Sequence, residues 1–398
     1  MSDPKHILVA FGGVSPEHEV SVLTAQQAIA ALKEQGRTVR ALYVSKSGRW
    51  FTGDVLLDLK SFEDIKKLES QAQPCTFGFD DYGKAVLKSE SRSWFSGTEV
   101  YPVDVVLTAF HGSEGENGSF QGTFETFNLP YTGAGVAGSA IGMDKPAAKD
   151  ICRAHDIPVV DDVIITESSW VNNSQYHLDE IEKLGLPVFV KPSGLGSSIG
   201  VSRADSREAA EEAIETAFRY DRRLLVEKAI TPLLEINCSV LGHLEACRPS
   251  VCEQPLGKEE LLSFEDKYMS NSDEGSKGMA SADRKIPAPI SQELTDKIQQ
   301  LACRAFTALN CSGVARLDFL VQEDTGEVYF NELNSIPGSF SFYLWKESGV
   351  DFKELLDELI SIGIKRHREK NGRVRSYDTN LLSEKAVKGI KGMKQTNS

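Results

Sequence analysis

The sequence predicts an α/β protein whose N-terminal part is a doubly wound parallel sheet. An apolar strand at 5–13 ends in Gly12-Gly13 and is followed by a helical pattern and a second strand, which makes a β–α–β unit. A further apolar segment, 104–110, also ends in a glycine-rich loop, 111–118. Strands that end in such loops and lead into helices are typical of parallel sheets that bind ligands at the carboxyl ends of their strands.

Local patterns predict the first elements. Apolar residues recur at helical spacing over 21–35, and Gly36 ends that helix. The next segment, 38–44, is predicted as the strand that completes the β–α–β unit. Residues 50–96 show no clear periodicity, and we interpret them as a loop-rich insertion.

A second unit begins near Met143. We predict a helix that continues to His155, strands at 187–191 and 223–227, and an acidic amphipathic helix at 206–220.

A third unit follows, and its middle, 262–286, is polar and rich in Gly and Ser, so we predict a mobile loop there. The predicted domains are therefore 1–141, 142–230 and 231–370, followed by a basic tail at 371–398. We expect the tail to be a solvated or partly helical extension; contact with RNA or acidic lipid is the alternative.

Bulk properties exclude several classes of protein. A chain of 398 residues predicts two or three domains. The formal charge of −14 argues against nucleic-acid binding, which needs a basic surface. The seven cysteines include no C-x-x-C pair, no secretory h-region opens the sequence, and no apolar run has transmembrane length. We therefore expect a cytoplasmic protein with reduced thiols and no membrane or nucleic-acid partner.

Two predicted strands near the C-terminus concentrate acidic side chains. The segment 313–321 presents Arg316 and Asp318 on one face, and a turn leads to a second strand with Glu332 and Asn334 on one face. A hairpin would bring these carboxylates and the amide together, and such oxygen donors suit Mg²⁺ bound to nucleotide phosphates. A solvated hairpin is the alternative, but the acids interrupt apolar runs, where unpaired carboxylates are costly.

A Gly/Ser loop follows the predicted strand at 187–191. Its sequence, Lys191-Pro-Ser-Gly-Leu-Gly-Ser197-Ser198-Ile-Gly, could surround phosphate oxygens with backbone N–H groups and hydroxyls. It is not a Walker A loop, because no Lys-Ser/Thr follows the glycines. A flexible turn is the alternative.

The run Gly133-Ala-Gly-Val-Ala-Gly138 fits G-x-G-x-x-G, and Asp156 lies where a ribose-binding acid would be sought. The run does not sit at the first strand-to-helix turn of its unit. We therefore interpret it as a tight turn that leads into a helix, not as a dinucleotide site.

Three spaced lysines, Lys145, Lys191 and Lys267, could all face nucleotide phosphates, although a lysine is usually a surface residue. Glu227 and Glu235 lie on either side of the strand end near Ile230, whose backbone could contact an adenine edge.

Together these motifs resemble the ATP-grasp superfamily, and specifically its D-alanine–D-alanine ligases. The resemblance covers nearly all of 5–365. The matching segments, in family order, are Phe11-Gly-Gly-Val-Ser-Pro-Glu17-His-Glu-Val-Ser21, His111-Gly-x-x-Gly-Glu116-Asn117-Gly-x-x-Gln-Gly122, Met143-Asp-Lys145, Val190-Lys-Pro192 with Gly196-Ser-Ser198, Asp266-Lys-Tyr268, Arg316-x-Asp318 and Asn331-Glu-x-Asn334-x-x-Pro-Gly338.

The resemblance implies a three-domain enzyme that holds ATP between its central and C-terminal domains. Lys145 and Lys191, with the loop serines Ser197 and Ser198, would contact the phosphates. Glu227 and the backbone near Ile230 would contact adenine, and Glu235 would contact ribose. Two Mg²⁺ ions, or Mn²⁺, would bind Asp318, Glu332 and Asn334.

The resemblance also implies substrate contacts. Glu17 would bind the ammonium of the first D-alanine, and Ser197 and Tyr268 would link it to the closing loop. His111 would lie in the substrate site, Lys267 would meet the transferred phosphate, and Arg316 would stabilise the oxyanion. The product would be D-alanyl-D-alanine for peptidoglycan precursors, made through an acyl phosphate, and we expect a homodimer.

Two positions depart from the family pattern. Asn117 replaces an aspartate near the first substrate site, and Tyr343 stands where the family has a serine that binds the carboxylate of the second substrate. We predict that Tyr343 takes over that contact, with the backbone after Gly338 and the neighbouring serine hydroxyls as further donors. Packing of Tyr343 in the core beside Phe342 and Trp345 is the alternative.

The second substrate therefore remains open between D-alanine and D-serine, D-lactate or another amino acid. A non-catalytic ATP-binding protein is the rival from another class. The complete set of Lys267, Arg316, Asp318, Glu332 and Asn334 argues against that rival, because a pure binder needs no catalytic residues.

Overall fold

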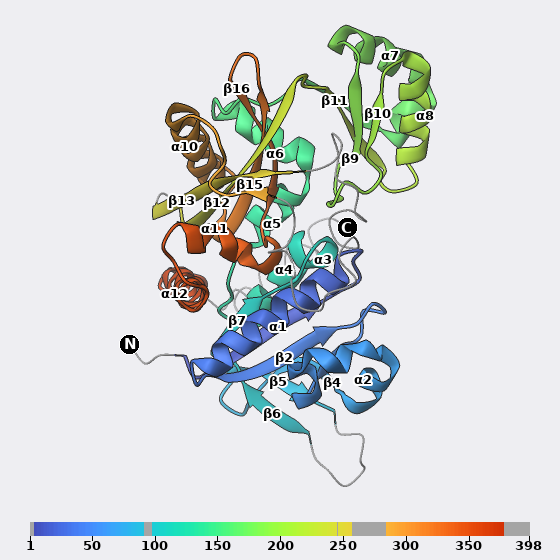
Figure 1. Cartoon of the computed structure of the whole chain (residues 1–398). Coiled ribbons are helices and arrows are strands. Elements are labelled where there is room, and N and C mark those ends of the chain that lie inside the picture. Colours follow the sequence, from blue (N-terminus) through green and yellow to red (C-terminus); the bar gives the residue numbers. More distant parts are fainter. Residues whose placement is uncertain (1–3, 91–97, 245, 257–283, 378–398) are drawn as a thin grey trace, which may run out of the picture.

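Three β-sheets organise the chain in the computed structural model (Figure 1). The structure describes residues 4–90, 98–244, 246–256 and 284–377. None of the helices in these ranges combines the length and apolar character needed to cross a bilayer. All seven cysteines lie in the described ranges and are free thiols.

The first sheet has the strand order β6-β5-β4-β3-β2-β1-β7. Its centre is the predicted β–α–β unit, β1 (His6–Gly12), α1 (His18–Glu34) and β2 (Thr38–Val44). Strand β1 pairs in parallel with β2 and with β7 (Val105–Thr108). The parallel arrangement in the N-terminal domain is therefore confirmed, and the carboxyl ends of β1 and β7 point toward the loops that bear the first motifs.

The interpretation of 50–96 as a loop-rich insertion is wrong. Strands β3 (Trp50–Thr52), β4 (Gln73–Phe79), β5 (Ala85–Ser89) and β6 (Glu99–Pro102) extend the sheet in antiparallel fashion. The short helices η1 (Asp54–Leu57), η2 (Leu59–Glu63) and α2 (Ile65–Gln71) connect them. These strands are short, and their order depends on distant partners: the Trp50 ring lies 5.6 Å from that of Phe120 in α4 (Ser119–Thr126).

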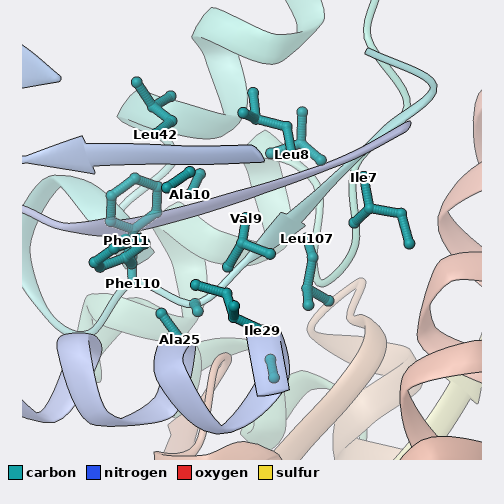
Figure 2. Packing of buried hydrophobic residues seen from close by; sticks show 14 of the residues in the cluster. Ile7, Leu8, Val9, Ala10, Phe11, Ala25, Ile29, Leu42, Leu107 and Phe110 are labelled. Atoms are coloured by element: carbon teal, nitrogen blue, oxygen red, sulfur yellow. The ribbon is translucent and has the colours of Figure 1, made fainter. Parts of the chain in front are cut away.

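The core of the first domain lies between the sheet and helix α1. Figure 2 shows Val9, Phe11 and Leu107 of the strands close to Ala25 and Ile29 of the helix. All of these side chains are buried, and burial of each large apolar group contributes about 1.5–3 kcal/mol. The rigid packing fixes the loops that follow β1 and β7.

The second sheet is small and entirely antiparallel, in the order β10-β9-β11-β8. Its strands are β8 (Asp162–Thr166), β9 (Val188–Pro192), β10 (Ser202–Ala204) and β11 (Arg223–Lys228). Helices α7 (Glu167–Leu184) and α8 (Arg207–Ala217) cover it (Figure 1). Their apolar side chains form a core with the strands, so this part of the chain is a unit of its own.

The third sheet has the order β14-β13-β12-β15-β16 and is also antiparallel. Its strands are β12 (Leu233–His243), β13 (Ala246–Pro255), β14 (Arg284–Lys285), β15 (Ser312–Gln322) and β16 (Glu327–Asn334). Helix α10 (Gln292–Ala308) packs against it, and so does α6 (Lys145–Ala154), which contributes Ala148 and Cys152 to the same core. Helix α6 therefore joins the third sheet, although the sequence places it in the second predicted domain.

Helices α11 (Phe342–Glu347) and α12 (Phe352–Asn371) connect the first and third domains. Trp345 and Leu355 belong to the same apolar cluster as Ile7 and Leu107. The Trp345 Nε1–H also donates to Ser239 Oγ of β12 at 3.0 Å. A continuous core therefore holds the two domains in a fixed relation.

The G-x-G-x-x-G run leads into helix α5 (Val136–Met143), as the turn interpretation expects. Gly133 has a φ of 83°, and Gly138 packs so closely that an added Cβ would lie 2.3 Å from the carbonyl oxygen of Asn310. Backbone conformation and close packing account for these two glycines.

Candidate active site

Residues from all three domains converge on one small cavity of about 30 Å³. Four residues predicted for the site line it: Glu17 after β1, Lys145 at the start of α6, and Glu332 and Asn334 at the end of β16. The remaining lining residues are Glu116, Gly142, Met143, Gly196, Leu333 and Ser335. The fold thus brings together motifs that are more than three hundred residues apart in the sequence.

The acidic hairpin forms as expected. In the β15–β16 pair, Asp318 lies opposite Glu332, and Arg316 lies opposite Asn334. The Arg316 guanidinium donates to both Asp318 oxygens at 2.7 Å, and Asn334 Nδ2 donates to Asp318 Oδ2 at 3.1 Å. Burial raises the pKa of Asp318 and outweighs the opposing effect of Arg316. The carboxylate therefore sits in a buried, hydrogen-bonded position that an additional positive charge would stabilise.

The donor set of the hairpin fits a hard divalent cation. Asp318, Glu332 and Asn334 supply only oxygen ligands from facing strands, and the Lys145 Nζ is 3.6 Å from Glu332 Oε2. Oxygen ligands of this kind are those that Mg²⁺ and Mn²⁺ prefer. Lys145 marks the side of the hairpin on which an anionic ligand would be stabilised.

A buried ion triad lies between the second and third domains. Lys149, Glu227 and Lys191 have side chains that are 0%, 2% and 12% exposed. Lys149 pairs with Glu227 Oε1, and Lys191 Nζ lies 2.5 Å from Glu227 Oε2. Burial alone would raise the pKa of Glu227, but the two ammonium groups lower it to about 2. The triad therefore fixes Lys191 through a permanently ionised carboxylate.

Lys149 was not among the residues singled out in the sequence. The available signal was its position four residues after Lys145, which places both lysines on one side of α6. Burial lowers the pKa of Lys149, while Glu227 opposes that shift. A lysine that is fully buried beside one carboxylate is a structural partner of Glu227 and not a surface charge.

Replacing Lys149 by methionine tests this role. We expect a loss of about 3 kcal/mol in stability, at the lower end of the cost of breaking a buried ion pair, because Lys191 still pairs with Glu227. We also expect a KM for ATP raised roughly 10-fold, because Lys191 would be held more tightly by Glu227 and less available to a phosphate. Thermal unfolding and steady-state kinetics measure the two effects.

Lys183→Met, which removes an exposed ion pair with Glu180, is the control and should change neither quantity appreciably. An unchanged ATP KM in Lys149→Met would contradict the link to Lys191.

The nucleotide-site residues predicted around this triad lie near one another. Burial lowers the pKa of Lys191, but the carboxylates of Glu227, Glu332 and Glu235 together raise it. Glu235 lies in β12, and Ile230 lies two residues after the end of β11. Lys191 therefore sits where the predicted metal site and the predicted ribose contact meet.

The Gly/Ser loop contacts the first domain. Ser197 Oγ donates to Glu17 Oε1, and Lys145 Nζ donates to the carbonyl oxygen of Leu195. Ser197 and Ser198 have φ values of 53° and 57°, the left-handed region that non-glycine residues rarely adopt. The loop is thus held in a strained conformation that brings Ser197 to Glu17, and this kind of strain is common at functional sites.

Glu17 lies close to the glycine of the second motif. A Cβ on Gly112, whose φ is 68°, would be 2.7 Å from Glu17 Oε2. The positive φ favours glycine there, and the Glu17 carboxylate occupies the space beside it. The backbone of the second motif therefore forms one wall of the Glu17 pocket.

Glu116 belongs to the second sequence motif, but the sequence alone assigns it no role. Its carboxylate accepts hydrogen bonds from the N–H of Gly112 at 2.7 Å, Ser335 Oγ at 3.0 Å and the N–H of Ile336 at 2.9 Å. Burial and the nearby charge of Glu17 raise its pKa to about 7. Glu116 therefore ties the first-domain loop to the segment that follows the metal hairpin.

His111 is buried in the same link between domains. Its Nε2 lies 2.9 Å from Thr24 Oγ1, and the ring is hydrogen-bonded to the backbone of Ile336. Burial and the charge of Arg316 lower its pKa from 6.5 to about 3. The imidazole is therefore neutral in the folded protein at every physiological pH.

His111 should make the protein acid-sensitive. The unfolded chain protonates His111 below pH 6.5 while the folded chain does not, so the stability that neutral His111 contributes is lost as pH falls toward 3. At pH 5 this loss is about 2 kcal/mol. We expect His111→Gln to have a lower free energy of unfolding than wild type at pH 7. At pH 5 this difference in free energy should be smaller by that amount, and the two melting temperatures should be closer together. A constant difference for His111→Gln would contradict the buried neutral state.

Tyr343 is buried, with 8% of its surface exposed, and lies on α11. Its O–H donates to Glu253 Oε1 of β13 at 3.2 Å. The phenol is therefore buried, as the core alternative expects, but its hydroxyl has a polar partner and is not free in a substrate pocket.

The other donors predicted beside Tyr343 differ from one another: the Ser341 Oγ is buried without a hydrogen-bond partner among the described residues, whereas the backbone N–H groups of the turn are engaged. The hydroxyls of Ser339 and Ser341 belong to buried residues in the left-handed turn η4 (Gly338–Ser341). The N–H of Ser339, the residue after Gly338, donates to Thr24 Oγ1 at 3.0 Å, and that of Phe340 donates to the carbonyl of Pro337 at 2.8 Å. This turn serves the contact between the first and third domains.

Asn117, the first departure from the family pattern, has a local role. Its Oδ1 accepts from the N–H of Ser119 at 3.1 Å and so stabilises the turn before α4. An aspartate could accept the same hydrogen bond, so the change is mild. Lys267 and Tyr268, the predicted loop residues, lie outside the described part of the chain, as does 378–398 of the tail.

Comparisons with known proteins match most of the chain. Residues 6–134 match the family model of the D-ala D-ala ligase N-terminus, and residues 151–361 match that of the D-ala D-ala ligase C-terminus. The D-alanine–D-alanine ligase of Thermosipho melanesiensis is 38% identical over 96% of this chain and 99% of its own length. That of Acetivibrio thermocellus is 36% identical over 95% of this chain and 100% of its own.

Solved structures give the same result. The D-alanine–D-alanine ligase of Coxiella burnetii superposes with a TM-score of 0.75 at 32% identity, covering 92% of this chain and 96% of that one. The VanG D-Ala:D-Ser ligase of Enterococcus faecalis gives 0.73 at 29% identity, covering 91% and 100%.

Proposed function

Since the chain belongs to the D-alanine–D-alanine ligase family, we propose that it uses ATP to join two D-alanines into D-alanyl-D-alanine, releasing ADP and phosphate. The observation that supports this most directly is the single cavity where Glu17, Lys145 and the acidic hairpin meet. An ammonium-binding carboxylate, a phosphate-binding lysine and a cation site are the three parts that the reaction requires. Because ATP is its co-substrate, we propose that the enzyme acts in the cytoplasm. Its product would serve peptidoglycan precursor synthesis, and we propose that the enzyme is a homodimer.

The first step transfers the γ-phosphoryl group of ATP to the carboxylate of the first D-alanine. Glu17, fixed by Ser197, binds the substrate ammonium and so orients its carboxylate toward the nucleotide. Lys145 and Lys191 stabilise the phosphate oxygens, and the backbone and hydroxyls of Ser197 and Ser198 surround them. Positioning and charge, without a covalent enzyme intermediate, account for this step.

The nucleotide base and ribose bind on the other side of the triad. Glu235 binds the ribose hydroxyls, and the backbone near Ile230 contacts the adenine edge. The Glu227 carboxylate is engaged by Lys149 and Lys191, so its contribution to the adenine contact is to shape that wall of the site.

Asp318, Glu332 and Asn334 would hold two Mg²⁺ ions, with Mn²⁺ as a substitute. Bound there, the ions would neutralise charge on the phosphate oxygens. The Arg316 fork on Asp318 keeps the carboxylate in place between strands β15 and β16.

In the second step the neutral amine of the acceptor attacks the acyl carbon of D-alanyl phosphate, and phosphate leaves. Arg316 stabilises the oxyanion of the tetrahedral intermediate. Lys267 and Tyr268, on the loop that would exclude water, assist the phosphate and complete the link from Glu17 through Ser197.

Product analysis tests the proposal. With ATP and equal D-alanine, D-serine and D-lactate, we expect D-alanyl-D-alanine as the main product at neutral pH, with little D-alanyl-D-lactate, because Tyr268 is the residue found in amine-accepting relatives. Mass spectrometry identifies the products. A spectrum dominated by the depsipeptide would show that D-lactate is the acceptor, and one dominated by D-alanyl-D-serine would show that it is D-serine. Absence of ADP formation with every acceptor would reject ligase activity.

A further inference from the structure

A row of polar side chains crosses the third sheet from the acidic hairpin. Glu332 lies opposite Asp318, Asp318 opposite Asn237, and Asn237 opposite Glu253. Residues directly opposite on neighbouring strands share a face of the sheet. Glu253 therefore lies on the same face as the hairpin, two strands away from Asp318, at roughly 10 Å.

Glu253 ends this row in a buried cluster. Its carboxylate, 2% exposed, accepts from Asn237 Nδ2 at 3.1 Å, from the Tyr343 O–H at 3.2 Å and from Arg284 Nη1 at 3.0 Å. The Arg284 guanidinium also stacks over the Tyr343 ring, 4.1 Å from its centroid. Three donors satisfy Glu253, so its function is to hold Arg284 and Tyr343 in place and not to bind a cationic substrate.

The cluster lies close to Arg316, the residue proposed to stabilise the oxyanion. Burial and Glu253 raise the pKa of Tyr343, while the guanidinium groups of Arg316 and Arg284 both oppose that shift. The Arg284 guanidinium thus stacks on the phenol ring, and the charge of Arg316 acts on the same phenol. Strand β14 pairs with the end of β13, so Arg284 stands where the chain returns to the sheet.

An acceptor amino acid presents its amine to the acyl carbon and must place its carboxylate a few ångströms further on. A carboxylate that leaves water needs a charged or hydrogen-bonding partner. The Tyr343 hydroxyl is directed to Glu253, and the N–H of Ser339 in the left-handed turn serves the domain contact. The Ser341 hydroxyl, buried without a partner among the described residues, is a neutral donor and supplies no charge. A guanidinium is a planar fork of five donors, well suited to recognise a second carboxylate while it remains paired with the first.

We propose that Arg284, stacked on Tyr343 and oriented by Glu253, binds the carboxylate of the acceptor amino acid, in place of the serine of other family members. This inference rests on the proposed ligase function. It assigns to Tyr343 the role of a platform under Arg284 instead of a direct carboxylate contact. It also implies that acceptors with a free α-carboxylate are preferred over their amides.

The test compares two acceptors in wild type and Arg284→Met. D-Alaninamide has the same amine and methyl group as D-alanine but no carboxylate, so it can act only as an acceptor. Wild type should use D-alanine at least ~10-fold better in kcat/KM than D-alaninamide, a difference of about 1.4 kcal/mol. Arg284→Met should lower kcat/KM for acceptor D-alanine by that factor and leave D-alaninamide almost unchanged, so that the preference disappears. A preference that persists in Arg284→Met would overturn the proposal.

Hydroxylamine separates this inference from the proposed function. It traps D-alanyl phosphate as the hydroxamate, releasing phosphate, without using an acceptor carboxylate. Arg284→Met should keep wild-type hydroxamate formation; loss of it together with dipeptide formation would show that Arg284 acts earlier and would refute the acceptor role. If wild type itself forms no hydroxamate, the proposed ligase function is rejected, and the role of Arg284 is rejected with it.

Three further variants guard against misfolding. Arg284→Lys keeps the ion pair with Glu253 but loses the planar fork, so it should fold and still lower the preference for D-alanine. Tyr343→Phe keeps the ring under Arg284, so acceptor KM should rise less than in Arg284→Met; the reverse order would favour a direct Tyr343 contact and overturn the proposal. The control is Arg248→Met, an arginine of β13 that stacks over Trp345 and pairs with Glu358 at the surface, and it should leave the preference unchanged.

Discussion

Replacing Glu332 by glutamine is expected to lower turnover at least ~100-fold, equivalent to about 2.7 kcal/mol of transition-state stabilisation, while the fold is retained. Glu332 lies opposite Asp318 at the end of β16, and its side chain is partly exposed beside Lys145. Glutamine preserves the shape and removes one negative charge from the set that would hold the cation. The effect should therefore fall on the phosphoryl-transfer step and not on folding.

The control for this substitution is on the same strand. Glu327 also lies in β16, is exposed, and accepts a hydrogen bond from the Tyr329 O–H at 2.8 Å. Glu327→Gln should leave turnover near the wild-type value. A second measurement, the rise in melting temperature on adding ADP with Mg²⁺, should shrink in Glu332→Gln only. Near-wild-type ADP formation in Glu332→Gln would reject the metal assignment.

The hairpin is an example of what the sequence could predict. Its two strands are adjacent in the chain, their apolar and polar residues alternate, and a short turn joins them, so pairing and facing side chains follow from local pattern. The structure shows Asp318 opposite Glu332 and Arg316 opposite Asn334. The β–α–β unit was predictable for the same reason, because each element has a clear period.

Features that depend on distant partners were not predictable. Strands β3 to β6 are short. Their order depends on pairings such as Phe51 with Pro74, twenty-three residues apart, and on ring contacts such as Trp50 with Phe120, seventy residues apart. Lys149 of helix α6 differs from a surface lysine only because Glu227 of strand β11 is buried beside it. Tertiary context, and not local propensity, decides such cases.

Tyr343 shows the same limit within the site. Alignment with a family motif located the residue but could not say where its hydroxyl points. Its partner, Glu253, lies on β13, ninety residues earlier, and Arg284 follows a segment of low apolar content. The substitution of a serine by a tyrosine is therefore understandable only together with the ion pair that surrounds it.

The domain contacts help to explain why the site is closed. Glu116 and Thr24 of the first domain accept hydrogen bonds from the N–H groups of Ile336 and Ser339 in the third, and Ser197 of the second donates to Glu17. Each contact involves a predicted ligand or a residue within two positions of one. Closure and the positioning of the substrate groups therefore depend on the same hydrogen bonds, an arrangement that excludes water from an acyl phosphate.

Arg316→Lys should lower D-alanyl-D-alanine formation by about 10²–10³-fold, the usual cost of losing one oxyanion donor. Arg316 is held by two parallel hydrogen bonds to Asp318 at 2.7 Å, which lysine cannot reproduce, although it keeps the positive charge beside the buried carboxylate. The fold should therefore survive, and the loss should appear where the guanidinium faces the tetrahedral intermediate. Because that intermediate forms only when the acceptor attacks, formation of D-alanyl phosphate should be affected much less.

Isotope exchange distinguishes the two steps. Exchange of ¹⁸O within the β–γ bridge of ATP, dependent on D-alanine, reports reversible acyl-phosphate formation, and dipeptide release reports the second step. In Arg316→Lys the exchange should remain within about threefold of wild type while dipeptide formation falls; this difference is the signature of an oxyanion role. If both fall together, Arg316 instead acts earlier by organising Asp318 and the cation site. Arg304→Lys, an exposed arginine of α10 that donates to the His155 carbonyl, should change neither rate, because its side chain is far from the hairpin face of the sheet.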